Sequence, residues 1–162
     1  MTTNPTPSTN LNGTEPKVIK IATVRFGDME FQEESVITVL GGIIGFPTLI
    51  RYVLIQRPSD APFYWLQSLD DPTMALVLVN PVLFKNDYNP PLPNIIQEEL
   101  KAEAPTDITL FAIVTIPAGR PQDMTANLLG PLVINPNSRL ARQLVLDDSL
   151  YSHRQPIIPA SE

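Results

Sequence analysis

The stretch from Phe63 to Pro81, FYWLQSLDDPTMALVLVNP, contains two apolar runs on either side of an Asp-Asp-Pro-Thr segment. Pro72 has the fixed φ that suits the second position of a tight turn, and Asp71 can hydrogen-bond to the turn backbone. The stretch is therefore predicted to form a β-hairpin. Its second strand, Met74 to Val79, is apolar without alternation, so we expect it to be buried on both faces. The hairpin contains neither histidine nor cysteine, which favours a protein that folds around a β core and functions by contact.

The composition indicates a single globular domain. Of the 162 residues, 43% are hydrophobic and 17% are charged, which is typical of a folded chain rather than a disordered one. The formal net charge of −6 argues against direct nucleic-acid binding, because neutralising phosphates requires clustered lysine and arginine. It favours a basic or mixed-charge protein partner instead. The absence of cysteine excludes disulfides and thiolate metal sites, and no cofactor is predicted.

The sequence predicts a cytoplasmic protein. No apolar run approaches the ~20 residues that cross a bilayer, so no membrane association is expected. The first residues, MTTNPTPSTNLNGTEPK, lack the basic and apolar segments of a secretory signal. Residues 1–16 are predicted to be a flexible Thr/Asn/Pro-rich tail, residues 17–157 one β domain, and residues 158–162 a short C-terminal tail.

Short β-branched and aromatic runs predict strands outside the central hairpin, at residues 18–21, 24–26, 29–31, 36–40, 52–55, 108–116, 124–134 and 143–146. A tight turn with Gly27 in its first position is expected between the second and third of these. One turn of helix is expected at residues 48–52. A longer helix is predicted from Asn94 to Ala104, with Asn94 as its N-cap and Pro105 ending it.

Glycine and proline add two local predictions. Gly41, Gly42 and Gly45 lack the Gly-Lys-Ser/Thr ending of a phosphate-binding loop, so we expect them to supply positive φ angles and a close backbone approach. Pro131 lies inside a predicted strand and indicates an edge or a bulge there. Many short strands with one helix predict a mostly β fold, either a barrel or a sandwich.

The residues offer little for catalysis. His153 is the only histidine, with Ser152 and Asp148 nearby, but no segment resembles a nucleophile elbow, so an exposed or structural histidine is predicted. Adjacent carboxylates occur at residues 33–34, 70–71 and 147–148. Neighbouring side chains on a strand point to opposite faces, so these pairs do not form acid/base dyads by themselves. No metal-ligand spacing appears, and an enzyme is not predicted.

The aromatic residues of the hairpin allow two interpretations. On a strand, Tyr64 faces opposite to Phe63 and Trp65. Large aromatic side chains usually pack in a core, but tyrosine and tryptophan are also frequent interface anchors. For the core, we expect Trp65 or Phe63 to be largely buried, together with Leu76, Leu78, Ile113 and Leu128.

Several motifs follow one another in a specific order: TVRFG at 23–27, GIIGF at 42–46, FYWLQSLDDP at 63–72, NP at 80–81, TANLLGPLVIN at 125–135 and QLVL at 143–146. In this order they resemble the FliW family of bacterial flagellar assembly factors. The resemblance covers nearly everything from Val18 to Ile157, and the segments beginning at Trp65 and Asn127 are its most specific parts. The chain departs from the family pattern at the glycine loop, where Ile44 replaces a proline and Pro47 an acidic residue.

This resemblance implies a single-domain, antiparallel β-barrel-like fold with one or two short helices. It implies a non-enzymatic factor that binds newly made flagellin and also binds the translational repressor CsrA without occupying its RNA-binding surface. Release of flagellin would then free the factor to capture the repressor, and flagellin mRNA would be translated. The alternative is a small β-barrel ligand-binding protein or enzyme. Converging polar groups inside the barrel would favour that alternative, and a dry apolar interior would favour the regulator.

The partner-binding surface is predicted from polar or amphipathic residues that the core does not obviously need. Most lie in the two segments most specific to the family, and we expect at least part of the surface on the hairpin and its turn, with the loop after the second strand beside it. The candidates are Tyr64, Gln67, Asp70, Asp71, Asn80, Tyr88, Asn127 and Asn135.

Overall fold

The central hairpin forms as the sequence predicts. The computed structural model describes residues 17–147 and 150–158. Within it, β5 (Phe63–Ser68) pairs antiparallel with β6 (Ala75–Val79), with Phe63 opposite Val79 and Gln67 opposite Ala75. No residue of β6 is exposed, and its last two residues are buried. Both faces are therefore buried at the end of the strand, at Leu78 and Val79, whereas its first three residues are only half-buried.

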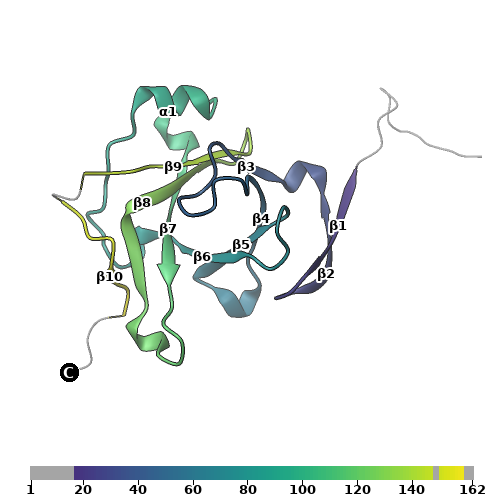
Figure 1. Cartoon of the computed structure of the whole chain (residues 1–162). Coiled ribbons are helices and arrows are strands. Elements are labelled where there is room, and N and C mark those ends of the chain that lie inside the picture. The colour runs from purple at the N-terminus through teal and green to yellow at the C-terminus, as the bar shows by residue number, and fades with distance from the viewer. Residues whose placement is uncertain (1–16, 148–149, 159–162) are drawn as a thin grey trace, which may run out of the picture.

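Further strands extend the hairpin into a closed barrel (Figure 1). On one side lie β4 (Arg51–Ile55), β3 (Ile37–Val39) and β9 (Leu140–Gln143), and on the other lie β7 (Thr109–Thr115) and β8 (Thr125–Asn135). The strand order is β8-β7-β6-β5-β4-β3-β9, and β9 pairs again with β8 to close the ring. All neighbours in the ring are antiparallel except β3 and β9. The mostly β, barrel-like fold with a short helix is thus confirmed.

Three short strands lie outside the ring. The short strand β10 (Gln155–Pro156) pairs with β8. A separate two-stranded sheet, β1 (Val18–Thr23) and β2 (Gly27–Gln32), lies beside the barrel near β4 and β5 (Figure 1). Its tip contacts the central hairpin, because the backbone N–H of Val24 donates to the Pro72 carbonyl at 3.2 Å.

Pro131 lies in a wide bulge of β8. Phe111 pairs with Leu132 while Ile113 pairs with Asn127, so residues 128–131 of β8 face the single residue Ala112 of β7. Because proline has no backbone N–H, it cannot donate a hydrogen bond to β7, and the bulge places Pro131 outside the regular pairing of the two strands. Its carbonyl still accepts from the backbone N–H of Leu144 at 2.8 Å, and the predicted bulge is confirmed.

The strand alternation separates an inner and an outer apolar cluster. Leu66 and Leu78 pack inside the barrel with Tyr52, Phe111 and Leu132. Phe63 and Val77 contact the outer cluster, which contains Val79, Val114 and Leu128. The alternation explains one correction: Trp65 and Phe63 point outward and are only half-buried, because the outer face is covered by loops rather than by a second layer. Leu78 and Leu128 are fully buried as expected, whereas Leu76 and Ile113 are half-buried beside the inner cluster.

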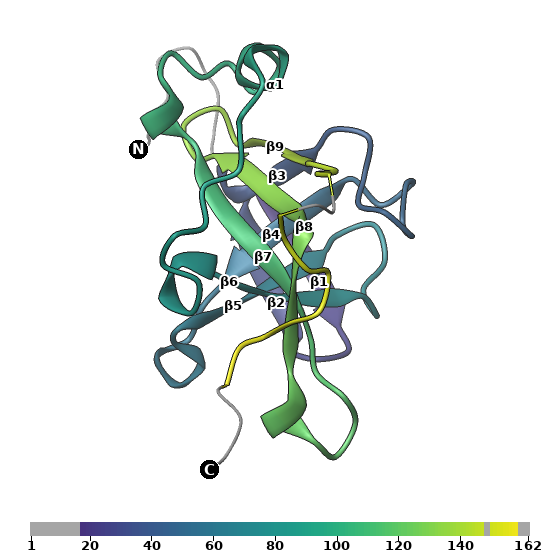
Figure 2. The ribbon, with the colours of Figure 1, turned by 90° about the vertical axis from the view of Figure 1, so that its left-hand side faces the viewer.

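The helix is shorter than predicted. α1 spans Asn94–Glu99, its N-cap is Pro93, and Asn94 is already its first residue. The helix ends well before Pro105 because Lys101 adopts a φ of 58°. Figure 2 shows α1 beyond the end of β8, and Leu100 at its C-cap is buried against Val133 and Leu144.

Three other local predictions are corrected. Gly27 ends the β1–β2 turn rather than beginning it, because the Thr23 hydroxyl accepts from the Phe26 N–H and donates to the Gly27 carbonyl. No helical turn forms at residues 48–52, since Arg51 and Tyr52 already belong to β4. The last barrel strand is Leu140–Gln143 rather than 143–146, because its register is fixed by pairing with residues 132–135 of β8.

Candidate functional site

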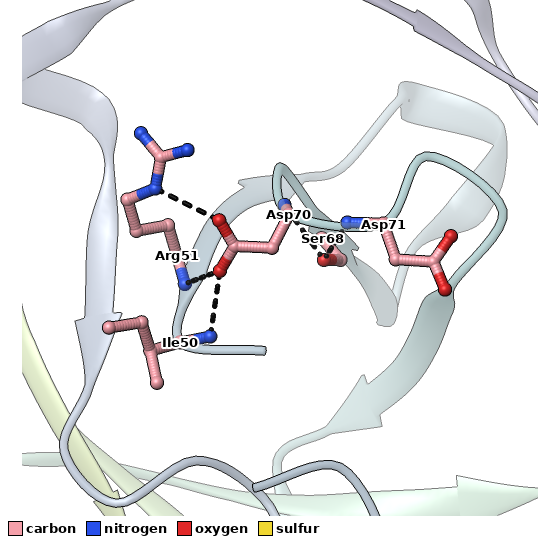
Figure 3. Close-up of polar contacts among 5 residues, drawn as sticks. All are labelled: Ile50, Arg51, Ser68, Asp70 and Asp71. Atoms are coloured by element: carbon pink, nitrogen blue, oxygen red, sulfur yellow. Dashed lines mark hydrogen bonds and ion pairs between the residues drawn. The ribbon is translucent and has the colours of Figure 1, made fainter. Parts of the chain in front are cut away.

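The turn between β5 and β6 is tied to the start of β4 by one carboxylate (Figure 3). Asp70 Oδ2 accepts from the backbone N–H groups of Ile50 and Arg51 at 2.9 and 3.0 Å, and its Oδ1 accepts from Arg51 Nε at 3.1 Å. The Ser68 hydroxyl oxygen accepts from the backbone N–H groups of Asp70 and Asp71. Asp70 therefore holds two segments about twenty residues apart in one rigid surface.

These hydrogen bonds determine the ionisation of Asp70. Burial alone would raise the pKa of its carboxyl, but the backbone N–H groups of Arg51 and Ile50 and the Arg51 side chain outweigh it and lower that pKa below the usual value. The pKa of Asp71 is lowered by the hydroxyl and then by the backbone N–H of Thr73. Both carboxylates are thus charged at neutral pH, and the turn is acidic.

A lowered folded-state pKa gives stability that is present above the unfolded pKa, about 4, and is lost as the pH falls below it. Asp70→Asn should therefore lower the free energy of unfolding at pH 7 by about 1 kcal/mol, after allowing for screening of a carboxylate at the surface. The variant should also lose less stability than the parent between pH 5 and pH 3. Urea unfolding at several pH values measures both effects, and parallel pH profiles would contradict this role for Asp70.

Gln67 lies beneath this turn. It is fully buried, and its Nε2 lies within hydrogen-bond distance of the carbonyl oxygens of Ser68, Pro72 and Met74. The side chain closes the turn from the inside and is not accessible from solvent. Its position in the family-specific segment therefore has a structural explanation.

Four further candidates share one local geometry. The side-chain oxygen of Asp71 accepts from the backbone N–H two residues later, at Thr73. The same arrangement recurs at three asparagines, Asn80 to Val82, Asn127 to Leu129 and Asn135 to Asn137. Each is an Asx turn, in which a short polar side chain replaces a backbone acceptor. Asn135 is also buried and donates to the Leu100 carbonyl, so it links α1 to the end of β8.

The other two candidates lie elsewhere on the barrel. Tyr64 points inward and packs against Phe111, with ring centroids 5.1 Å apart. Tyr88 is buried on the outer face, where its hydroxyl donates to the Leu128 carbonyl at 2.6 Å. The pKa of this hydroxyl is raised, mainly by burial and then by the neighbouring Tyr151. Tyr88 and Asn80 line the same groove of about 320 Å³ on the outside of the barrel.

The eight predicted residues consequently do not form a single surface. Gln67, Asp70 and Asp71 meet at one turn, and Asn80 and Tyr88 meet at one groove. The remaining three are separate. Of all eight, Asp70 and Asn80 are exposed, whereas Tyr64, Asp71 and Asn127 are half-buried and the other three are buried. Asp70 and Asn80 are therefore the most accessible to a partner.

Three exposed apolar residues in the segment between β3 and β4 were missed by the sequence analysis. Ile44, Phe46 and Ile50 are 65%, 42% and 39% exposed, and Ile50 is the residue whose backbone N–H binds Asp70. Their loop is held by a bridge between Ile43 and Phe46 and by a hydrogen bond from the Ile44 N–H to Gln143 Oε1 at 2.8 Å. The signal in the sequence was a run of apolar residues interrupted by glycines, in which Ile43 is buried while Ile44 is exposed.

The described residues contain no cluster of three or more potential metal ligands. His153 and Ser152 are exposed. Asp148 lies outside the described residues, as do the predicted tail at 1–16 and residues 159–162 of the tail predicted at 158–162. No helix in the described part of the chain is long and apolar enough to cross a membrane.

Fold and surface together define a small closed β-barrel protein. It carries an acidic turn, which contains Asp70 and Asp71, and an exposed apolar loop, which contains Ile44 and Phe46. A model of the FliW protein family matches residues 20–157, and the chain belongs to the FliW family. The flagellar assembly factor FliW of Magnetococcus marinus is 38% identical over 143 residues, which cover 88% of this chain and 87% of that protein. The flagellar assembly factor FliW of Bdellovibrio bacteriovorus is 42% identical over 137 residues, covering 85% and 78%.

The fold agrees with a solved structure as well. A crystal structure of the flagellar assembly factor FliW superposes with a TM-score of 0.81 at 34% identity, covering 88% of this chain and 99% of that one. The resemblance inferred from the ordered motifs is therefore confirmed. It extends over the barrel and over the turns that carry the candidate residues.

Proposed function

We propose that this protein is a cytoplasmic, non-enzymatic regulator that binds flagellin and the translational repressor CsrA, and so relieves repression of flagellin mRNA translation. The observation that carries the proposal is membership of a family of flagellar assembly factors over residues 20–157. The net charge of −6 fits a partner that itself binds RNA. The same charge disfavours direct binding of this chain to nucleic acid.

The barrel interior favours a regulator over the alternative of a ligand-binding barrel or enzyme. Leu66, Leu78 and Leu132 fill its middle and are fully buried. Among side-chain atoms of the described residues, the Tyr52 hydroxyl, which belongs to the inner cluster, and the Gln67 amide oxygen, on the opposite face of β5, are buried without a hydrogen-bond partner. A filled, apolar middle of the barrel favours a protein-binding function on the outer surface.

The proposed partner surface combines the acidic turn with the apolar loop. Asp70 and Asp71 supply negative charge, and Ile44 and Phe46 supply apolar side chains on a rigid backbone. Charges at the rim of an interface mainly tune association, while apolar anchors that become buried control dissociation. Asn80, which is exposed and lines the groove that follows β6, is a second position that a partner could contact. Gln67, Asn127 and Asn135 would contribute by shaping the turns.

Titration calorimetry with purified flagellin and purified CsrA tests the proposal. We expect saturable binding to each protein and none to RNA. In surface plasmon resonance, Asp70→Asn combined with Asp71→Asn should slow association more than it speeds dissociation. Ile44→Ser combined with Phe46→Ser should instead speed dissociation, at a cost of ~2 kcal/mol or more if these are the anchors.

Matched controls separate a binding effect from a folding effect. Glu98→Gln combined with Glu103→Gln also removes two negative charges, but from exposed positions at or near α1. This variant should leave the association and dissociation rates near those of the parent. All variants are first checked for an unchanged fold by circular dichroism. Unchanged rates for both turn and loop variants would place the partner surface elsewhere, and failure to bind either protein would overturn the proposed function itself.

A further inference from the structure

The barrel has an open pocket at the end opposite to the Asp70 turn. It opens where β3 begins and β4 ends, whereas Asp70 binds the residues at which β4 starts. Its volume is about 430 Å³, within the range of ~300–1,000 Å³ typical of small-molecule sites. The proposed partner surface uses no residue of this pocket.

The floor of the pocket is apolar and aromatic. Ile37, Phe111 and Ile134 are buried there, and Leu54 and Tyr64 are half-buried. The rings of Tyr64 and Phe111 meet edge to face at an interplanar angle of 70°. A flat or branched apolar group of a few carbon atoms would find aromatic faces and aliphatic side chains on this floor.

The rim of the pocket carries one charge of each sign. Glu34 and Arg139 both line the pocket and are both exposed. Among the described residues, the ion pairs join other side chains, and neither Glu34 nor Arg139 takes part in one. A carboxylate and a guanidinium therefore stand at the same opening with their charges uncompensated by the protein.

Arg139 occupies a backbone conformation that does not suit arginine. Its φ is 60°, a left-handed conformation in which glycine or asparagine is the usual residue. Its backbone is fixed on both sides, because its N–H donates to the Asn135 carbonyl at 2.7 Å and its carbonyl accepts from the Thr38 N–H at 3.0 Å. The turn between β8 and β9 therefore fixes the backbone from which Arg139 reaches the rim of the pocket.

We propose that this pocket binds a free α-amino acid with an apolar side chain. The carboxylate of the ligand would pair with Arg139 and its ammonium group with Glu34, while its side chain would lie on the floor beside Tyr64 and Phe111. A simple anion would face the Glu34 carboxylate, and a simple cation would face the Arg139 guanidinium, so a zwitterion complements the rim best. This binding site lies beyond the regulatory function proposed above and does not depend on it.

Calorimetry on the full chain with three probes tests the ligand chemistry. The probes are L-phenylalanine, 3-phenylpropionate, which lacks the ammonium group, and 2-phenylethylamine, which lacks the carboxylate. We expect saturable binding of L-phenylalanine, with each of the other probes weaker by about fivefold or more, since each loses one charged contact at a solvent-exposed rim. Equal affinities for all three would contradict recognition of a zwitterion.

Two variants test the assigned residues. Arg139→Gly removes the guanidinium and places glycine in a conformation that suits it, so the thermal midpoint should stay within about 4 °C of the parent while affinity for L-phenylalanine falls about fivefold. Glu34→Gln should weaken it similarly, and Arg154→Gln, an exposed arginine outside the pocket, should not change it. Absence of saturation at about 10 mM L-phenylalanine, or binding that survives both rim variants, would overturn the proposal.

Discussion

Leu66→Ala is expected to lower the free energy of unfolding by about 2–5 kcal/mol, because it removes a fully buried side chain from the inside of the barrel and leaves a cavity. Its neighbour Trp65 is larger but points to the outer face and is half-buried. Trp65→Ala should therefore cost less, about 1–2 kcal/mol, since only part of its apolar surface is removed from water. Urea unfolding followed by circular dichroism measures both.

The contacts of Trp65 predict which part of the protein Trp65→Ala will destabilise. Its ring meets Phe26 at a centroid distance of 5.8 Å, and the Arg25 guanidinium carbon lies 4.3 Å above it. Both partners belong to the turn between β1 and β2, so Trp65→Ala should speed amide hydrogen exchange in that small sheet while β5 stays protected. Leu83→Ala, at a residue 62% exposed, serves as the control with little effect. A larger loss of stability for Trp65→Ala than for Leu66→Ala would place the main core on the outside of the barrel.

The fold was largely predictable because its signals are local. The central hairpin follows from two apolar runs around a proline turn, and the bulge at Pro131 follows from a missing donor. The errors arose where distant pairing decides the outcome. Nothing near residue 143 indicates that the last strand must match β8 at residues 132–135, and nothing near Asn94 indicates that Lys101 will turn the chain and end the helix early.

The candidate site was less predictable for a related reason. A polar residue in an apolar segment can face a partner or can satisfy its own backbone, and the sequence is the same in both cases. Asp71, Asn80, Asn127 and Asn135 all accept from the N–H two residues later, which gives each a structural role whatever else it does. The exposed Ile44 and Phe46 were missed for the opposite reason, because apolar residues are normally assigned to a core.

Gly42→Ala is expected to have the largest effect among substitutions in the apolar loop, at about 2–4 kcal/mol. Gly42 adopts a φ of +72°, and an added Cβ would lie 2.6 Å from the Pro47 carbonyl oxygen and 2.7 Å from the Pro47 Cα. These are backbone atoms, so the clash cannot be relieved by rotating a side chain. The turn that joins Gly42 to Pro47 must open, and the bridge between Ile43 and Phe46 should be lost with it.

Gly45→Ala is the matched control, because Gly45 also has a positive φ of +94° but an added Cβ there meets nothing within 4 Å. It should cost only the backbone strain of a left-handed residue, about 1–2 kcal/mol. Thermal unfolding compares the two variants, and surface plasmon resonance on the folded fraction shows whether the display of Ile44 and Phe46 matters. If the loop is a rigid anchor, Gly42→Ala should speed dissociation of a bound partner more than Gly45→Ala does. Equal losses of stability for both variants would mean that strain alone, and not the close approach to Pro47, makes glycine necessary at position 42.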